Sequence, residues 1–247
     1  MIIKKHYQGF SLVELMVAML LGLLITGAAL QLFLANQQSF ALQQALSRIQ
    51  EDGQLFVRFL VRDLRQAGLE MDDVVSSYPQ GVKFVTTQGK PGSSNGANYD
   101  RLTIAYHGVS DCEGGAVAGG SAAEIVNTYF VNDESELVCD GSVSGGDGVV
   151  LLEGVQAFEV MYGIDTNKNG YANAGQYVSA GDLGGKEAVA VRFAILLKND
   201  SLSLPESEGT QKFYVLQKEI TAPQDQAVRR VFMSTVKLRN YSDWDAI

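Results

Sequence analysis

The carboxylate of Glu14 is the side chain whose surroundings most require an explanation, because it lies in an apolar segment. No acidic, basic or histidine residue follows it until Arg48. The stretch Leu15–Ala35 is almost wholly apolar, with Thr26 and Gln31 as its polar exceptions. A carboxylate inside an apolar segment is costly and usually marks function. We therefore expect a cation near Glu14 wherever this segment is buried, because a paired charge costs much less than an isolated one.

The element that positions Glu14 is a helix long enough to cross a membrane. At 1.5 Å per residue, the roughly 21 residues of Leu15–Ala35 reach about 30 Å, the thickness of a bilayer core. Lys4 and Lys5 flank the segment on its N-terminal side, which predicts that this end stays cytoplasmic and that the chain beyond lies outside. A secretory signal peptide fits less well, because the apolar stretch is too long and lacks a small-residue cleavage site. A plain membrane anchor is the simplest alternative, but it leaves Glu14 unexplained.

The two cysteines, Cys112 and Cys139, form the second candidate site. Outside the inner membrane thiols oxidise, so we expect a disulfide that closes a loop of about 28 residues. Chain-entropy arithmetic gives such a bridge about 3.6 kcal/mol. Two independent buried thiols are the alternative. Metal binding by the pair is less favoured, because His6 and His107 are the only histidines.

A third candidate is a calcium loop, because the segment 165–173 matches the front half of the pattern Asp-x-Asp/Asn-x-Asp/Asn-Gly. Its oxygen ligands would come from the first, third, fifth, seventh and twelfth positions of the loop: Asp165, Asn167, Asn169, the Tyr171 carbonyl and Gln176. The last position requires a bidentate glutamate, so a glutamine there predicts weak affinity. An ordinary Asn/Gly hairpin turn is the alternative. No other cofactor is expected.

Composition excludes several function classes. The net charge of −9 repels phosphate backbones, so no nucleic-acid partner is expected. His107 has no nucleophile motif around it, and no glycine-rich loop with a lysine is present to hold a phosphate. We therefore expect a protein that is not an enzyme.

The helical pattern continues beyond the apolar segment as an amphipathic stripe. Apolar residues recur at three- and four-residue intervals: Leu42, Leu46, Ile49, Gly53, Phe56, Val57, Leu60, Val61 and Leu64. Polar residues, Asp63 among them, fill much of the rest, and Gly68 suits a C-terminal cap. We predict one helix from about Phe10 to Ala67, with a membrane-spanning part over 10–35 and an amphipathic part over 36–68.

Residues 69–247 are predicted to form a β-rich globular head. The expected strands are rich in Val, Ile, Phe, Tyr and Thr: Gly81–Thr87, Arg101–His107, Asn127–Val131, Gly148–Tyr162, Ala188–Lys198, Lys212–Glu219 and Arg229–Arg239. They follow one another without intervening helices, so the sheet should be mainly antiparallel. Packing it on the amphipathic half of the helix gives an α+β fold, and the size of the head allows two sheet lobes.

The string Lys4-Lys5-His6-Tyr7-Gln8-Gly9-Phe10-Ser11-Leu12-Val13-Glu14-Leu15 resembles the class III signal of type IV prepilins. The resemblance implies a pilin-like fold and a leader peptide at 1–9. It also implies that prepilin peptidase cuts between Gly9 and Phe10, where a residue without a side chain permits close approach to the backbone. The same enzyme would methylate the new amine of Phe10. Glu14 would use that cation to align a subunit with its neighbour during assembly, because residues four apart share one helix face.

Three further segments resemble the PilW-type minor pilins: Arg58–Gly68, Met161–Asp165 and Val228–Asn240. That resemblance implies a protein that helps to initiate assembly of type IV pilus filaments. Its partners would be other minor and major pilins, prepilin peptidase and the inner-membrane assembly platform. It would sit in the inner membrane with its head in the periplasm, and later in the filament at the cell surface. The alternatives are a type II secretion pseudopilin and a membrane-anchored periplasmic binding or enzymatic domain.

Overall fold

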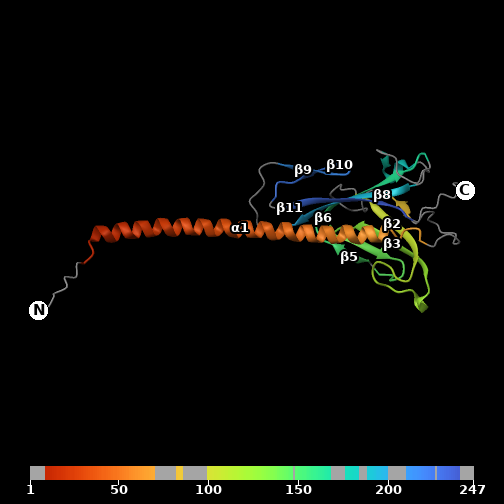
Figure 1. The fold of residues 1–247 in the computed structure, drawn as a ribbon, viewed down its shortest axis with the longest axis horizontal. Helices are drawn as coiled ribbons and strands as arrows, with labels where there is room; N and C mark the ends of the chain where they lie inside the picture. Colours follow the sequence, from red (N-terminus) through yellow and green to blue (C-terminus); the bar gives the residue numbers. More distant parts are fainter. Residues whose placement is uncertain are drawn as a thin grey trace. The chain divides into compact units, whose positions relative to one another are not determined.

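The computed structural model describes residues 9–69, 82–85, 99–146, 148–167, 176–183, 188–199, 210–225 and 227–239. The chain divides into two compact units, Met1–Gln44 and Ala45–Ile247. One helix, α1 (Leu12–Leu64), runs through both (Figure 1). The other described elements are strands and two short 3-10 helices, Ala118–Gly120 and Ala180–Asp182.

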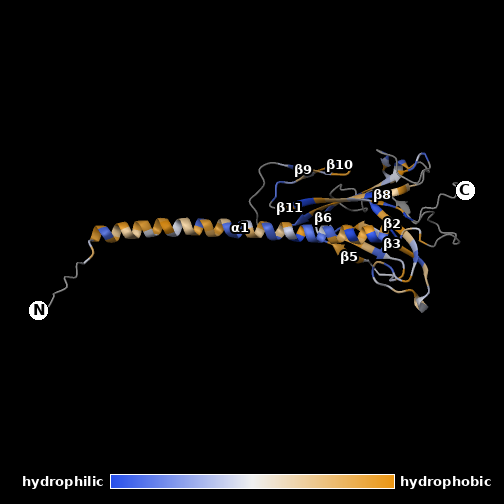
Figure 2. Ribbon diagram, viewed as in Figure 1, coloured by the Kyte–Doolittle hydropathy of each residue, from blue (hydrophilic) through white to orange (hydrophobic). Residues whose placement is uncertain are grey.

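The two parts of α1 differ in the surface they present. From Leu12 to Phe40 every side chain is exposed, and most of the large ones are apolar. Figure 2 shows these hydrophobic residues around the first part of the helix and mixed polar residues along the second. The second part buries one stripe: Ala45, Ile49, Gly53, Phe56, Leu60, Asp63 and Leu64. The predicted amphipathic pattern is confirmed from Ile49 onward, whereas Leu42 and Leu46 are exposed.

The helix ends slightly earlier than predicted, at Leu64 instead of Ala67. Gly68 follows with a φ of +77°, the left-handed conformation that glycine adopts beyond a helix end. Its amide donates to the Ala105 carbonyl of strand β2 (Arg101–Gly108) at 2.9 Å. The chain therefore leaves the helix by pairing with the sheet, which shortens the helical run.

The first sheet of the head has five described strands in the order of the sequence, and all neighbours are antiparallel. They are β1 (Val82–Val85), β2, β3 (Ala123–Val131), β4 (Leu137–Gly141) and β5 (Val149–Leu152). Each strand pairs with the next strand along the chain, which gives a simple up-and-down order. The predicted α+β fold with antiparallel sheets is confirmed.

A second sheet has the order β11-β8-β6-β7 and is also antiparallel. Its described strands are β6 (Val155–Ile164), β7 (Tyr177–Val178), β8 (Ala188–Asn199) and β11 (Val228–Lys237). A separate hairpin consists of β9 (Gln211–Val215) and β10 (Lys218–Ala222). It packs through Val215 on Ala157, Ala194 and Leu196 of the second sheet, forming a small core distinct from the main one.

The main core joins the buried stripe of α1 to both sheets. The ring of Phe56 meets Phe158 of β6 and Phe193 of β8 edge-on, with centroids 6.4 and 6.2 Å apart. At Gly53 the helix approaches β11 so closely that an added Cβ would lie 2.3 Å from the ring of Phe232. Glycine at this position permits the close approach of helix and sheet.

Three predicted strands are wrong in their extent, and one of them, Asn127–Val131, lacks the first four residues of β3. Gly148–Tyr162 is interrupted between β5 and β6, where Gly154 has a φ of +70° and lies against the Lys198 carbonyl. Lys212–Glu219 is a hairpin that turns after Val215, with Leu216 at a φ of +54°. In the latter two places the chain reverses or bends within a stretch rich in strand-forming residues. Such residues indicate extended, buried backbone, and they do not indicate where a turn occurs. Strand β4, which contains Cys139, was not predicted because its residues Asp140 and Gly141 lower its strand propensity.

Candidate functional site

The N-terminal part of the candidate site consists of Gly9, Phe10 and Glu14. Gly9 and Phe10 precede α1, and both are exposed. An added Cβ at Gly9 would meet nothing within 4 Å, so the backbone on the N-terminal side of Phe10 is open to a protease. Glu14 lies in the first turn of α1, where a carboxylate also interacts favourably with the unpaired amides of the helix.

The expected placement of Phe10 and Glu14 on one helix face needs a correction. The first hydrogen bond of the helix runs from the Leu15 amide to the Ser11 carbonyl at 3.1 Å, and α1 begins at Leu12. Ser11 therefore occupies the N-cap position, which serine favours. Phe10 lies outside the helix in the full-length chain, where its nitrogen is part of a peptide bond, so helical geometry does not hold this nitrogen above Glu14.

The apolar part of α1 satisfies the hydroxyl of Thr26 internally and leaves its small residues uncovered. The Thr26 hydroxyl donates to the Gly22 carbonyl one turn earlier at 2.7 Å, so it needs no partner from outside. Gly22 and Gly27 have nothing within 4 Å of an added Cβ. Small residues on an open helix surface permit another helix to approach closely. Among the described residues, α1 is the one helix long and apolar enough to cross a membrane.

The head contains a buried polar cluster that holds the end of α1. The carboxylate of Asp63 is 4% exposed and accepts hydrogen bonds from the Tyr129 hydroxyl and from the Asn127 amide, the latter at 3.0 Å. Both partners lie on β3 and are fully buried. The expectation that Asp63 lies on the polar side of the helix is wrong. It stands seven residues after Phe56, on the apolar stripe, and that spacing is the signal that the sequence offered.

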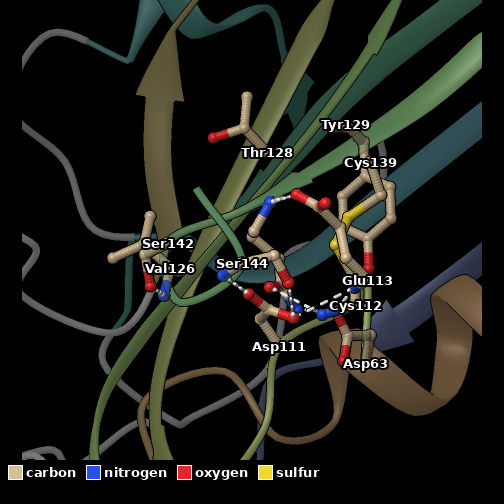
Figure 3. The surroundings of a disulfide bond; sticks show 12 residues. Asp63, Asp111, Cys112, Glu113, Val126, Thr128, Tyr129, Cys139, Ser142 and Ser144 are labelled. Atoms are coloured by element: carbon tan, nitrogen blue, oxygen red, sulfur yellow. Dashed lines mark hydrogen bonds between the residues drawn. A yellow bond between two sulfur atoms is a disulfide. The ribbon is translucent and has the colours of Figure 1, made fainter. Parts of the chain in front are cut away.

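Asn127 connects this cluster to the disulfide. Its side-chain oxygen accepts from the Cys112 backbone amide at 3.1 Å, while its nitrogen donates to Asp63 and to the Tyr106 hydroxyl at 3.3 Å. The Tyr106 hydroxyl in turn donates to the Ser110 carbonyl at 3.1 Å. The helix end, strand β3 and the loop that carries Cys112 are therefore joined by one chain of hydrogen bonds. Figure 3 shows Asp63 and Tyr129 beside this disulfide.

Burial determines the protonation behaviour of the cluster. Desolvation raises the pKa of Asp63 above its ordinary value, although the hydrogen bonds from Tyr129 and Asn127 oppose the rise. Burial, and next the neighbouring Asp63 carboxylate, hold the pKa of Tyr129 well above its usual range. The tyrosine therefore remains a hydrogen-bond donor at any physiological pH.

The predicted disulfide is confirmed: Cys112 and Cys139 are bonded, with their Cα atoms 6.3 Å apart. Asp111, next to the bridge, holds two loops together (Figure 3). Its carboxylate accepts from the amides of Gly115 at 2.8 Å, Val143 at 2.9 Å and Ser144 at 2.7 Å. Burial opposes ionisation here, but these amides and the Ser144 hydroxyl outweigh it and lower the pKa of Asp111. The crosslinked loops are thus fixed by both a covalent bond and a stable anion.

The predicted calcium loop lies only partly within the described residues. Asp165, Asn167 and Gln176 are described, whereas Asn169 and Tyr171 lie outside. The Asn167 amide donates to the Asp165 carboxylate at 3.2 Å, an arrangement common in ordinary turns. Within the described residues no group of three or more His, Cys, Asp or Glu side chains is arranged to hold a metal. The calcium site stays a prediction.

Comparison with known protein families bears on both parts of the chain. Residues 4–30 match the family model described as the prokaryotic N-terminal methylation motif. Residues 125–240 match the model of the type IV pilus-assembly protein W. Together the two matches support a type IV pilin-like minor pilin. The motif implies processing of this minor pilin by prepilin peptidase, and the family implies a structural role through contacts with other pilins.

Two further comparisons add little to this assignment of the minor pilin. The type IV-like pilin TTHA1219 from Thermus thermophilus is similar to it at 16% identity with a TM-score of 0.46, covering 78% of this chain and 98% of that one. No curated protein sequence matches the chain. The apolar helix and the prepilin motif together indicate that the minor pilin is anchored in a membrane.

Proposed function

We propose that this minor pilin helps to initiate type IV pilus assembly at the inner membrane, in a complex with other minor pilins. The observation that carries the proposal is the joining, in one chain, of a prepilin motif over 4–30 to a head of the PilW type over 125–240. A type II secretion pseudopilin would share the leader and the apolar helix. The match of the head to the PilW model favours the pilus.

In the proposed reaction, prepilin peptidase cleaves between Gly9 and Phe10 and methylates the new amine of Phe10. The open surroundings of Gly9 support this assignment, because the enzyme needs access to the backbone. Glu14 then aligns the subunit by pairing with the amine of Phe10 in its own or an adjacent chain. It is the one charged residue between Phe10 and Ser47, so no other side chain in that segment supplies an ionic constraint.

The head is proposed to lie in the periplasm and, after assembly, on the filament. Lys4 and Lys5 ahead of the apolar segment support a cytoplasmic leader. The Cys112–Cys139 bridge supports an oxidising compartment for the head. The proposed role is structural, without catalysis, and the proposed partners are minor and major pilins and the assembly platform.

The processing part is tested by the intact mass of the protein isolated from membranes. We expect a mature chain that starts at N-methylated Phe10, and accumulation of the uncleaved precursor when Gly9 is replaced by leucine. A mature chain that starts beyond Ala35, or one that keeps residues 1–9, would show that the leader assignment is wrong.

The assembly part is tested with Glu14→Val in a strain that lacks the native copy. We expect insertion and cleavage to persist, since the substitution removes a charge from the membrane and spares the scissile bond. Filament number and co-purification with other minor pilins should fall. Gln31→Val, which also makes the segment more apolar, serves as the matched control and should assemble normally. Normal piliation by Glu14→Val would remove the assembly role from this residue.

A further inference from the structure

An open groove runs between α1 and strand β5 in the head. It has a volume of about 680 Å³, and residues of α1 from Arg48 to Phe59 form one wall. The opposite wall is the segment Val150–Gly154 with the end of β8. Its apolar lining is partly solvent-exposed, with Leu55 57% and Val150 46% exposed. Apolar surface gathered in a groove is a common feature of sites where other polypeptides bind.

The strand beside the groove, β5, is a four-residue strand at the edge of the first sheet as far as the structure describes it. Within the described residues β5 pairs with β4 alone, so backbone groups on its other side lack a strand partner. Natural edge strands are usually guarded by charged residues or proline. Val149–Leu152 contains neither, and Val149 is 37% exposed. An edge of this kind accepts an additional strand from another chain.

The groove follows this edge. Five consecutive residues, Val150–Gly154, line it, whereas a groove over one face of the strand would be lined by alternate residues. An occupant of the groove would therefore meet the free backbone of β5 on one side and the Leu55 and Phe59 side chains of α1 on the other. An extended segment with apolar side chains satisfies both walls.

The charged residues around the groove limit the kinds of molecule that can bind there. Arg48 and Asp52 line the helix side of the groove, with the Arg48 Nε atom 3.9 Å from a carboxylate oxygen of Asp52. Glu153 and Lys198 line the sheet side. Two cations and two anions balance, in a chain whose net charge is −9. A phosphate-rich ligand or an anionic lipid surface finds no excess of positive charge here. The rim complements a neutral polypeptide that carries charges of both signs.

We propose that this groove binds an extended segment from the head of another pilin subunit, which adds a strand to the free edge of β5. The inference rests on the proposed function, and it names the surface through which the minor pilin recognises a partner. The groove lies within the head, so the occupant that the proposed function supplies is the head of a neighbouring pilin. The backbone groups of β5 that are unpaired within the described residues favour an extended strand as the partner. The balanced charges at the rim favour a polypeptide over a phosphate-rich ligand.

The test is site-specific photo-crosslinking of the full chain in pilus-forming cells. A photoreactive residue replaces Val150, and the same residue at Val109, a valine that is 52% exposed elsewhere in the head, serves as the control. We expect Val150 to crosslink to another protein that carries a prepilin leader, with the linked peptide in its head and in a predicted strand. Val109 should give at least tenfold less of that product.

A substitution supplies the second readout. Val150→Asp places a charge on the exposed edge and should lower co-purification of the crosslinked pilin at least tenfold, while Val109→Asp leaves it unchanged. Formation of the Cys112–Cys139 bridge and an unaltered melting temperature verify that the head of each variant is folded. Crosslinks from Val150 to a second copy of this chain, to lipid, to the apolar helix of a partner, or to nothing would each overturn the inference.

Failure of this inference is separable from failure of the proposed function. The wild-type gene should restore filaments to a strain lacking the native copy, whatever binds in the groove. If filaments return and Val150 gives no crosslink to a pilin head, the groove inference is wrong and the assembly role stands. If filaments are not lost by deletion, the assembly role is wrong.

Discussion

Replacing Asp63 with alanine should destabilise the head and release the end of α1. The substitution removes the acceptor of two buried donors, the Tyr129 hydroxyl and the Asn127 amide. A buried donor left without a partner costs about 1–3 kcal/mol. Both donors lie on fully buried residues, so we expect a loss of roughly 2–6 kcal/mol in the free energy of unfolding.

A double-mutant cycle isolates the contact between helix and sheet. Tyr129→Phe removes one donor and leaves the ring that packs against Phe59, with centroids 6.4 Å apart. Hydrogen bonds to a charged group contribute about 1.5–3 kcal/mol, so the coupling energy between the two positions should fall in that range. Urea unfolding of the detergent-solubilised protein, followed by circular dichroism, measures each corner. Hydrogen exchange along α1 should rise most near Leu60 and Leu64 in Asp63→Ala.

The pH dependence supplies an independent test of the same carboxylate. Burial raises the folded-state pKa of Asp63 above 3.8, so folding favours its protonated form. The stability that this group contributes is fully present below 3.8 and is lost as pH rises through the folded pKa. Asp63→Asn keeps an acceptor oxygen and does not ionise. The stability of this variant relative to wild type should therefore increase between pH 3.8 and neutrality.

Two results would refute this account of the cluster. The first is Asp63→Ala with an unchanged urea midpoint, or with an effect that adds to that of Tyr129→Phe without coupling. The second is a stability difference between wild type and Asp63→Asn that does not change with pH. Either outcome would mean that the carboxylate is hydrated or paired differently from the arrangement on β3.

The remaining predictions concern the disulfide, the calcium loop and one glycine. Serine at both Cys112 and Cys139 should lower the unfolding free energy by about 3.6 kcal/mol, measured by urea titration, and an equal midpoint in oxidised and reduced wild type would contradict this. If the 165–176 loop holds calcium, millimolar Ca²⁺ should raise the melting temperature and Asp165→Ala should abolish the rise; an unchanged melting curve makes the loop an ordinary turn. Gly154→Ala should destabilise the head by more than Gly119→Ala. Both glycines have positive φ, but only Gly154 would place its Cβ 2.3 Å from a backbone carbonyl; equal losses would contradict this.

Much of the architecture was predictable because it depends on local pattern. A charge-free run of apolar residues followed by an amphipathic stripe predicts one long helix, since both features are read over neighbouring residues. The strands β2, β8 and β11 were located from their β-branched and aromatic content. The disulfide followed from the compartment that the N-terminus predicted, because two cysteines in an oxidising space have one possible pairing. The prepilin motif, which the family match over 4–30 supports, predicts roles for Gly9, Phe10 and Glu14 without any knowledge of the head.

The sequence alone therefore determined the N-terminal apolar segment, whose properties depend only on its own residues. The apolar helix, its single carboxylate and the prepilin motif need no distant residue to have their properties, so the pattern of neighbouring residues is enough to predict them. Only the tertiary structure decided that Asp63 is buried, that Asn127 joins it to Cys112, and that β5, among the described strands, lies at the edge of its sheet beside α1. Asp63 and Asn127 are 64 positions apart in the chain. Pairings of that kind depend on sheet register and helix rotation, which the packing of the whole core selects and no local pattern records.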